Sequence, residues 1–222
     1  MTYVWIILGI LVALVVLRVL WVIGKIVFAF WMLKKGAKTF LEEVGKTAMA
    51  KQPDAINLVP TSGYTWKATG KFNDFTSTFT QLGFSDVGVY MIPELPNMVA
   101  QLWVKPGEKS YAIVYEHPKA GCWADIVSVY RNGDRYWATQ RPPTGLDQAP
   151  NTRVTRCPDA DAMALHEAFL RERPSGEMVS IDATNAVAVF QDAYATDNAW
   201  RKQQGISAQE VAHVAKNRIQ KV

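Results

Sequence analysis

One cysteine and two histidines are the residues whose chemistry could support nucleophilic catalysis. That chemistry needs a thiolate beside an imidazole. Cys122 follows His117 by five residues, across the connection between two predicted strands, and His166 lies on a predicted helix beside Leu165 and Phe169. His117, Cys122 and His166 are therefore the candidate catalytic residues, although no flanking motif marks a nucleophile. The alternative interpretation is a buried thiol with core or solvated histidines.

Other motifs for chemistry are missing from the sequence. It contains no GxGxxG, GxxxxGK[ST], HExxH or GxSxG pattern. Two cysteines without a CxxC spacing, Cys122 and Cys157, and three scattered histidines do not predict a zinc site. Glu94 and Glu116 are carboxylates without a recognisable acid pair. The sequence therefore predicts no metal and no cofactor, and it favours a protein that is not an enzyme.

The elements that would position these residues begin with an apolar N-terminus. Residues 1–33 contain no acid and only two charges, Arg18 and Lys25. A bilayer core of about 30 Å needs about 20 mostly apolar helical residues. No basic segment precedes the run and no small-residue cleavage site follows it, so an uncleaved signal anchor is expected rather than a signal peptide. Residues 1–33 are predicted to be a single-pass transmembrane anchor.

Charge predicts the direction of this anchor. Lysines at 34, 35 and 38 follow the apolar run, which predicts an outside N-terminus and a cytoplasmic C-terminal domain. Seven basic and two acidic residues lie in 1–51, whereas the rest of the chain has 17 basic and 18 acidic ones. The excess positive charge therefore belongs to the membrane flank, and a nucleic-acid partner is not favoured.

Arg18 and Lys25 are candidates for contact with another membrane protein subunit. They are seven residues apart, so both project from one stripe of a helix. An intramembrane charge is a functional candidate by default. The alternative is that both side chains extend to the interface without a protein partner. The predicted partners are thus the lipid bilayer and a second membrane subunit.

The remainder of the chain predicts an α+β fold. Residues 34–62 are interpreted as a basic juxtamembrane helix and linker, and residues 63–222 as a soluble α+β domain. Alternating apolar residues and short turns predict an antiparallel meander of about five strands. Asn132-Gly133 is a strong hairpin signal within it. The five strands are expected at 84–92, 98–104, 110–116, 122–130 and 135–140.

Helices are expected to pack with this meander. Helical spacing of apolar residues predicts a helix over 72–82, another from Asp159 or Asp161 to Arg171, and a third over 183–203. Ser207 and Glu210 form a capping box that begins the last helix. The predicted fold class is therefore α+β, with an N-terminal transmembrane helix, the five-stranded antiparallel meander and helices packed with it.

The last two predicted helices partly resemble a helix-turn-helix module. The turn Gly205-Ile206-Ser207 carries the likeness, but Arg201 stands where that motif has alanine, and Gln204 where it has an apolar residue. A capped αα-hairpin explains the same residues. Three hypotheses therefore stand: a membrane-anchored accessory or scaffolding protein with an interaction domain; a membrane-tethered enzyme using the His117/Cys122 region; and a membrane-tethered DNA-binding regulator.

Overall fold

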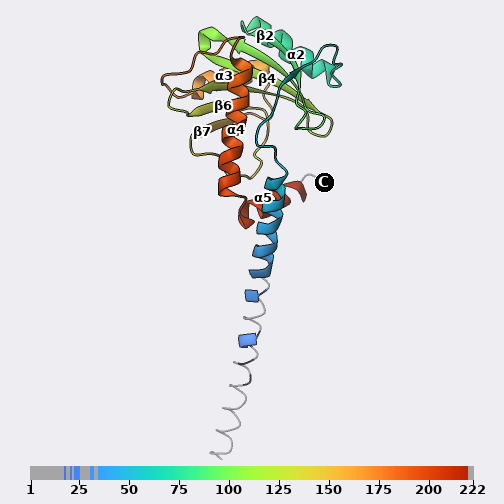
Figure 1. The fold of residues 1–222 in the computed structure, drawn as a ribbon, viewed down its shortest axis with the longest axis vertical. Coiled ribbons are helices and arrows are strands. Elements are labelled where there is room, and N and C mark those ends of the chain that lie inside the picture. Colours follow the sequence, from blue (N-terminus) through green and yellow to red (C-terminus); the bar gives the residue numbers. More distant parts are fainter. Residues whose placement is uncertain (1–17, 19–20, 22, 26–30, 33–34, 220–222) are drawn as a thin grey trace, which may run out of the picture.

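A computed structural model of the 222-residue chain describes residues 18, 21, 23–25, 31–32 and 35–219, and the side chains to 214. The fold is α+β, as expected. A seven-stranded sheet lies between helices that cover both of its faces (Figure 1). The strands follow one another across the sheet in chain order. This order means that each strand pairs with its neighbours in sequence.

The sheet is larger than predicted and it is mixed. Five strands match the predicted meander, but two more were missed, one in the predicted linker and one in the Pro-rich connection. All neighbours are antiparallel except the last pair, β6 and β7, which is parallel. The prediction of a five-stranded antiparallel meander is corrected accordingly. The strands are β1 Val59–Pro60, β2 Ser85–Met91, β3 Val99–Lys105, β4 Ser110–His117, β5 Gly121–Val129, β6 Arg135–Thr139 and β7 Thr152–Arg156.

Helices cover the two faces of the sheet separately. Helices α2 and α3 pack on one face through a core that includes Phe79, Ile126 and Phe169. Helix α4 packs on the other face, where Phe190 meets the side chains of β3, β4 and β5. A helix over 35–50 precedes the sheet and runs close to α5 (Figure 1). The labelled helices are α2 Thr69–Gln81, α3 Ala162–Glu172, α4 Ala186–Gln204 and α5 Ala208–Ile219, and a short 3-10 helix, η1, spans Pro106–Glu108.

Local capping explains where the helices begin. The Asp161 carboxylate accepts a hydrogen bond from the Ala164 N–H, which fixes the first turn of α3. Ser207 and Glu210 form the predicted capping box: the Ser207 N–H donates to Glu210 Oε2 at 2.9 Å, and the Glu210 N–H donates to Ser207 Oγ at 3.2 Å. The expected hairpin between β5 and β6 is also present, with Gly133 at a φ of 87°.

The predicted transmembrane anchor is not supported. In the part of the chain that the structure describes, no helix is long and apolar enough to cross a bilayer. The prediction depended on the hydropathy of residues 1–33, most of which lie outside the described residues, and those described there include the charged Arg18 and Lys25. The finding overturns the anchor, the single-pass topology and the predicted placement of the domain in the cytoplasm.

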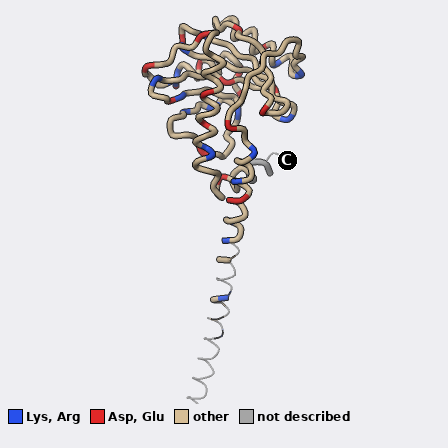
Figure 2. Tube along the Cα trace, in the orientation of Figure 1, with Lys and Arg blue, Asp and Glu red and all other residues tan. Residues whose placement is uncertain are grey.

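Charged residues are interspersed over the domain. Figure 2 shows acidic and basic positions alternating along the sheet and its helices, without one extended region of a single sign. Several of the charges occur in ion pairs, including Arg135 with Asp197 and Arg201 with Glu210. The charges of this domain therefore interact mainly as individual pairs.

Candidate ligand-binding cavity

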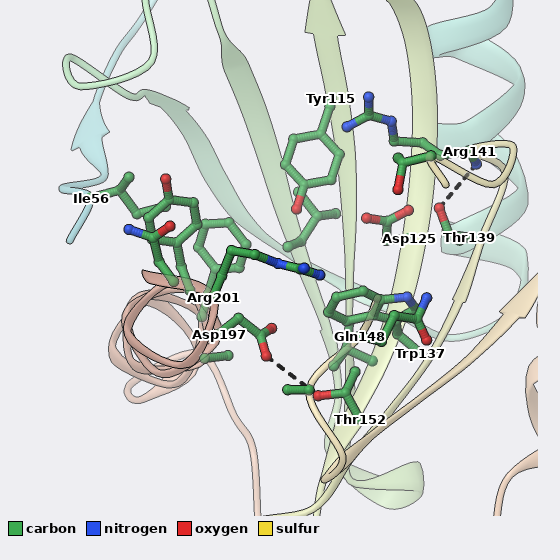
Figure 3. A pocket seen from close by; sticks show the side chains of 18 of the residues that line it. Ile56, Tyr115, Asp125, Trp137, Thr139, Arg141, Gln148, Thr152, Asp197 and Arg201 are labelled. Carbon is green, nitrogen blue, oxygen red and sulfur yellow. Dashed lines mark hydrogen bonds between the residues drawn. The ribbon is translucent and has the colours of Figure 1, made fainter. Parts of the chain in front are cut away.

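A cavity of about 420 Å³ lies between the sheet and α4. Its floor is the face of β4, β5 and β6 that also carries the Phe190 core, and its rim is the connection over 140–151 (Figure 3). Ligand pockets commonly have volumes of about 300–1,000 Å³. The cavity is therefore large enough for a small organic molecule. Its principal lining residues are Ile56, Ile113, Tyr115, Trp123, Asp125, Trp137, Arg141, Arg156, Phe190, Tyr194 and Arg201.

Strand register places one acid in this otherwise apolar floor. Side chains alternate between the two faces of a strand, so Trp123, Asp125 and Val127 of β5 share the cavity face. Ladder pairing sets Asp125 between Ile113 of β4 and Thr139 of β6. The acid therefore lies on the central strand of the floor, away from either edge of the sheet.

The rim follows from the parallel pairing of β6 and β7. A chain that leaves the end of β6 has to return over the length of that strand before β7 can run parallel to β6. The connection between the two strands is therefore long. Segment 140–151 makes this return across the cavity. Arg156 Nη1 donates to the carbonyl oxygens of Arg141 and Pro142, at 3.2 and 3.3 Å. The Asp147 N–H donates to Glu210 Oε1 at 2.8 Å, so the rim is held at its start and near its middle.

Aromatic rings form much of the cavity wall. Tyr115 and Trp123 stack with their ring centroids 5.0 Å apart, and Phe190 approaches Tyr115 at 6.4 Å. The Arg141 guanidinium lies 4.9 Å from the centroid of the Trp123 ring, within the range of a cation–π interaction. The walls therefore combine flat apolar surfaces with one cation already held against them.

Asp125 has an unusual environment for an aspartate. It is half-buried, and its Oδ1 atom is covered and has no hydrogen-bond partner among the described residues. Burial raises the pKa of Asp125 to about 6, against opposing effects of Thr139, Arg141 and Arg156. Figure 3 shows its carboxylate beside Tyr115 and Thr139, facing the cavity. Asp125 therefore changes charge close to neutral pH.

The remaining acids and cations of the cavity are mostly paired. Arg135 Nη2 lies 2.5 Å from Asp197 Oδ1, and Thr152 also donates to this oxygen at 3.3 Å. Arg201 extends from α4 into the cavity in Figure 3, and its Nη1 donates to Glu210 Oε1 at 2.8 Å. In contrast, neither Arg141 nor Arg156 forms an ion pair within the described residues.

Two indole groups add unused donors to the same wall. The Nε1 atoms of Trp123 and Trp137 are buried and have no hydrogen-bond partner among the described residues. Buried polar atoms in native proteins normally have such partners. With Asp125 Oδ1, the cavity residues therefore include two donors and one acceptor that no described protein group satisfies.

The structure places His117 and Cys122 on opposite faces of the sheet. Cys122 pairs directly with Glu116 and shares its face, which is covered by α2 and α3, while His117 is the next residue along β4. His117 Nδ1 instead accepts from the N–H groups of Lys119 and Ala120 in the turn, both at 3.2 Å. Burial raises the pKa of the Cys122 thiol to about 11, which disfavours the thiolate at neutral pH.

The other predicted catalytic residue, His166, lies on α3 and belongs to a structural cluster with Glu108 and Lys105. Its Nε2 atom is 2.8 Å from Glu108 Oε2, and Lys105 contacts the other oxygen of that carboxylate at 2.6 Å. Burial acts to raise the pKa of Glu108, but hydrogen bonds from Lys105 and His166 outweigh it and lower the pKa. The His166 ring also packs edge-on against Phe84. His166 is therefore close to neither His117 nor the cavity.

Glu116 likewise has a structural role. It is buried and accepts hydrogen bonds from the Tyr64 hydroxyl and from the N–H groups of Lys67 and Ala68, at 2.8 to 3.0 Å. Burial favours a raised pKa, but these three donors together lower the pKa of Glu116. The carboxylate thus fixes the segment before α2 to the end of β4.

The two N-terminal charges lie far from the cavity along the chain. Arg18 is exposed, and Lys25 Nζ lies 3.7 Å from the centroid of the Trp21 ring. Their predicted contact with a membrane subunit required the transmembrane anchor. Because the structure does not support that anchor, this prediction is withdrawn. The side chains of 215–219, which would supply most polar contacts of a DNA-reading helix, lie outside the described residues.

Sequence reasoning missed the residues that converge in the cavity. The available signal was Asp125, a carboxylate in the middle of the mostly apolar run 122–130. A second signal was the pair of arginines at the two ends of the Pro-rich connection, Arg141 and Arg156. Neither signal specifies a site until the register of β5 and the return path of 140–151 are known.

Neither a cluster of metal ligands among the described residues nor a comparison with known proteins assigns a further role to this site. Within the described residues, no group of three or more His, Cys, Asp or Glu side chains could hold a metal ion. No protein family model matches the chain, and neither a curated protein nor a solved structure is similar to it.

Proposed function

We propose that the domain binds a small molecule with an apolar body and a polar head in the cavity between the sheet and α4. The observation that carries this proposal is the combination of an apolar floor with Asp125, Arg141 and Arg156 at one end. Natural ligand sites show the same division between apolar walls and a few convergent polar groups.

The described geometry supports a binding role better than the other hypotheses. A scaffolding role does not require a cavity with an acid, two arginines that form no ion pair and two indole donors that make no hydrogen bond among the described residues. The His117/Cys122 hypothesis requires a thiolate–imidazole contact, and those residues occupy opposite faces of the sheet. The cavity also lies on the face with α4, separate from the cores of α2 and α3.

The apolar part of the cavity can be tested with a neutral fluorescent probe. N-phenyl-1-naphthylamine has two aromatic groups, a naphthyl and a phenyl, and no charge, so its binding reports on the aromatic walls. We expect saturable binding to one site on the full chain. The Ala193→Phe variant places a ring in the cavity from α4 and should weaken binding about tenfold or more, or about 1.4 kcal/mol.

A matched variant controls for effects on α4 itself. Ala188 is exposed on the same helix and does not line the cavity, so Ala188→Phe should leave probe binding unchanged. Circular dichroism of both variants should match that of the natural chain. Equal affinity of both variants for the probe, or no saturable binding by the natural chain, would refute the proposed function.

A further inference from the structure

We infer that the polar head of the ligand is a carboxylate, which binds to the guanidinium groups of Arg141 and Arg156 and shares a proton with Asp125. This inference rests on the proposed ligand-binding function and specifies the chemical class of the ligand. Three features of the polar end of the cavity support it: the net charge there, the free hydrogen-bonding groups of the two arginines and the position of Asp125 beside them.

The charge at this end of the cavity favours a single anion. Arg141, Arg156 and Asp125 together carry a formal charge of +1 when the acid is ionised. The nearby pairs Arg135–Asp197 and Arg201–Glu210 are each neutral. Asp147 and Arg141 are both exposed on the rim, but the charges that shift the pKa values of Asp125 and Arg156 include that of Arg141 and not that of Asp147. The net positive charge of the free cluster therefore attracts an anion.

The two arginines have donors available for this anion. Arg156 uses Nη1 for the carbonyl oxygens of Arg141 and Pro142, which fixes the guanidinium while Nε and Nη2 make no hydrogen bond within the described residues. The Arg141 guanidinium carbon lies 4.9 Å from the centroid of the Trp123 ring, and its side-chain N–H groups make no hydrogen bond within the described residues. A planar guanidinium edge matches the two oxygens of a carboxylate.

The same contact argues against a cationic ligand. An ammonium group would need the faces of the aromatic wall, but Arg141 already occupies the Trp123 face at 4.9 Å. It would also lie beside two positive charges and only one carboxylate. A cation would therefore be repelled by Arg141 and Arg156, whereas an anion is attracted by both.

Asp125 is a second carboxyl group beside the position proposed for the ligand's carboxylate. Two carboxyl groups at close range cannot both ionise readily, so one of them holds a proton. The proton is taken from solvent as the ligand binds, and it forms a hydrogen bond between the two carboxyl groups. The groups facing Asp125 are Tyr111 and Tyr115 of β4, Arg141 of the rim, Arg156 of β7, and Asp197 and Arg201 of α4.

The test uses isothermal titration of the full chain with 1-naphthaleneacetate and its neutral amide, 1-naphthaleneacetamide. We expect the acid to bind about tenfold or more tightly than the amide at pH 6, with a smaller advantage at pH 8. Titration at pH 7 in two buffers of different ionisation enthalpy should show uptake approaching about one proton per bound acid. The amide should show no uptake.

Variants separate the two parts of the inference. Arg141→Gln should remove most of the advantage of the acid over the amide, whereas Arg153→Gln, an exposed arginine on β7 outside the cavity, should preserve it. Asp125→Asn should still bind the acid but without proton uptake. Equal binding of acid and amide, or binding of the acid without proton uptake, would overturn the inference.

Three further outcomes distinguish this inference from the proposed function. If N-phenyl-1-naphthylamine binds but the acid gains nothing over the amide, the cavity is a ligand site and the carboxylate assignment is wrong. If 1-naphthyl phosphate binds more tightly than the acid, the head group is a phosphate instead and the assignment again fails. If none of the probes binds, the proposed function itself fails.

Discussion

Replacing Asp125 by asparagine should stabilise the folded protein at alkaline pH, and the gain should shrink as pH falls. Burial raises the pKa of Asp125 from 3.8 to about 6, so the native state holds this proton more tightly than the unfolded chain. Between these two values the native state binds more protons, and stability falls as pH rises. Asparagine does not titrate, so the variant escapes this loss.

The magnitude follows from the difference between the two pKa values. Each pKa unit corresponds to 1.36 kcal/mol, so a difference of about two units gives about 3 kcal/mol at pH 8. About 1 kcal/mol of this is already present at pH 4.5, because the unfolded aspartate has mostly ionised there. The stability advantage of Asp125→Asn should therefore grow by about 2 kcal/mol between pH 4.5 and pH 8, less any screening by solvent in the cavity.

Urea unfolding at the two pH values measures this growth. Both proteins are unfolded at 25 °C with tryptophan fluorescence and circular dichroism as independent probes, and the free energies of unfolding are compared at each pH. Asp192→Asn, a change of the same kind at an exposed position of α4, serves as the control and should show no such trend. An Asp125→Asn advantage that is the same at both pH values would refute the reasoning, because Asp125 would then ionise alike in both states.

Three further changes test structural elements outside the cavity. Asp161→Ala removes the N-cap of α3 and should cost about 1 kcal/mol in urea unfolding. Glu116→Gln replaces a carboxylate that accepts three hydrogen bonds and should cost about 1–3 kcal/mol at pH 7, with a smaller cost at acidic pH as the natural carboxylate itself becomes protonated. In Gly45→Val, a Cβ would lie 2.7 Å from the Ile206 carbonyl oxygen, so faster hydrogen exchange is expected over 35–50.

The sequence was sufficient for the elements that depend on local pattern. Strands β2 to β6 are short segments rich in apolar residues between turns, and antiparallel neighbours need only short connections. The α3 cap and the capping box at Ser207 and Glu210 are likewise local features, and the structure shows both. These predictions succeeded because sequence neighbours provide the interactions that define each element.

The two missed strands depend on distant partners. β1 consists of Val59 and Pro60 alone, and proline at a sheet edge is not a strand signal. β7, with the sequence TRVTR, is short and lies in a Pro-rich region, and its parallel partner β6 is separated from it by the whole connection 140–151. Parallel pairing is not recognisable from local spacing, so the sheet appeared smaller and entirely antiparallel.

The cavity depends on these same missed features. A chain that left β6 by a tight turn would form an antiparallel hairpin and leave the face around Asp125 open. The parallel β7 instead forces segment 140–151 back across that face and carries Arg141 to its beginning and Arg156 to the strand that follows. Glu210 then holds the Asp147 N–H and Arg201 together, which joins this rim to the turn between α4 and α5. The unpredicted parallel pair thus converts an open part of the sheet face into a site with two cations beside a half-buried acid.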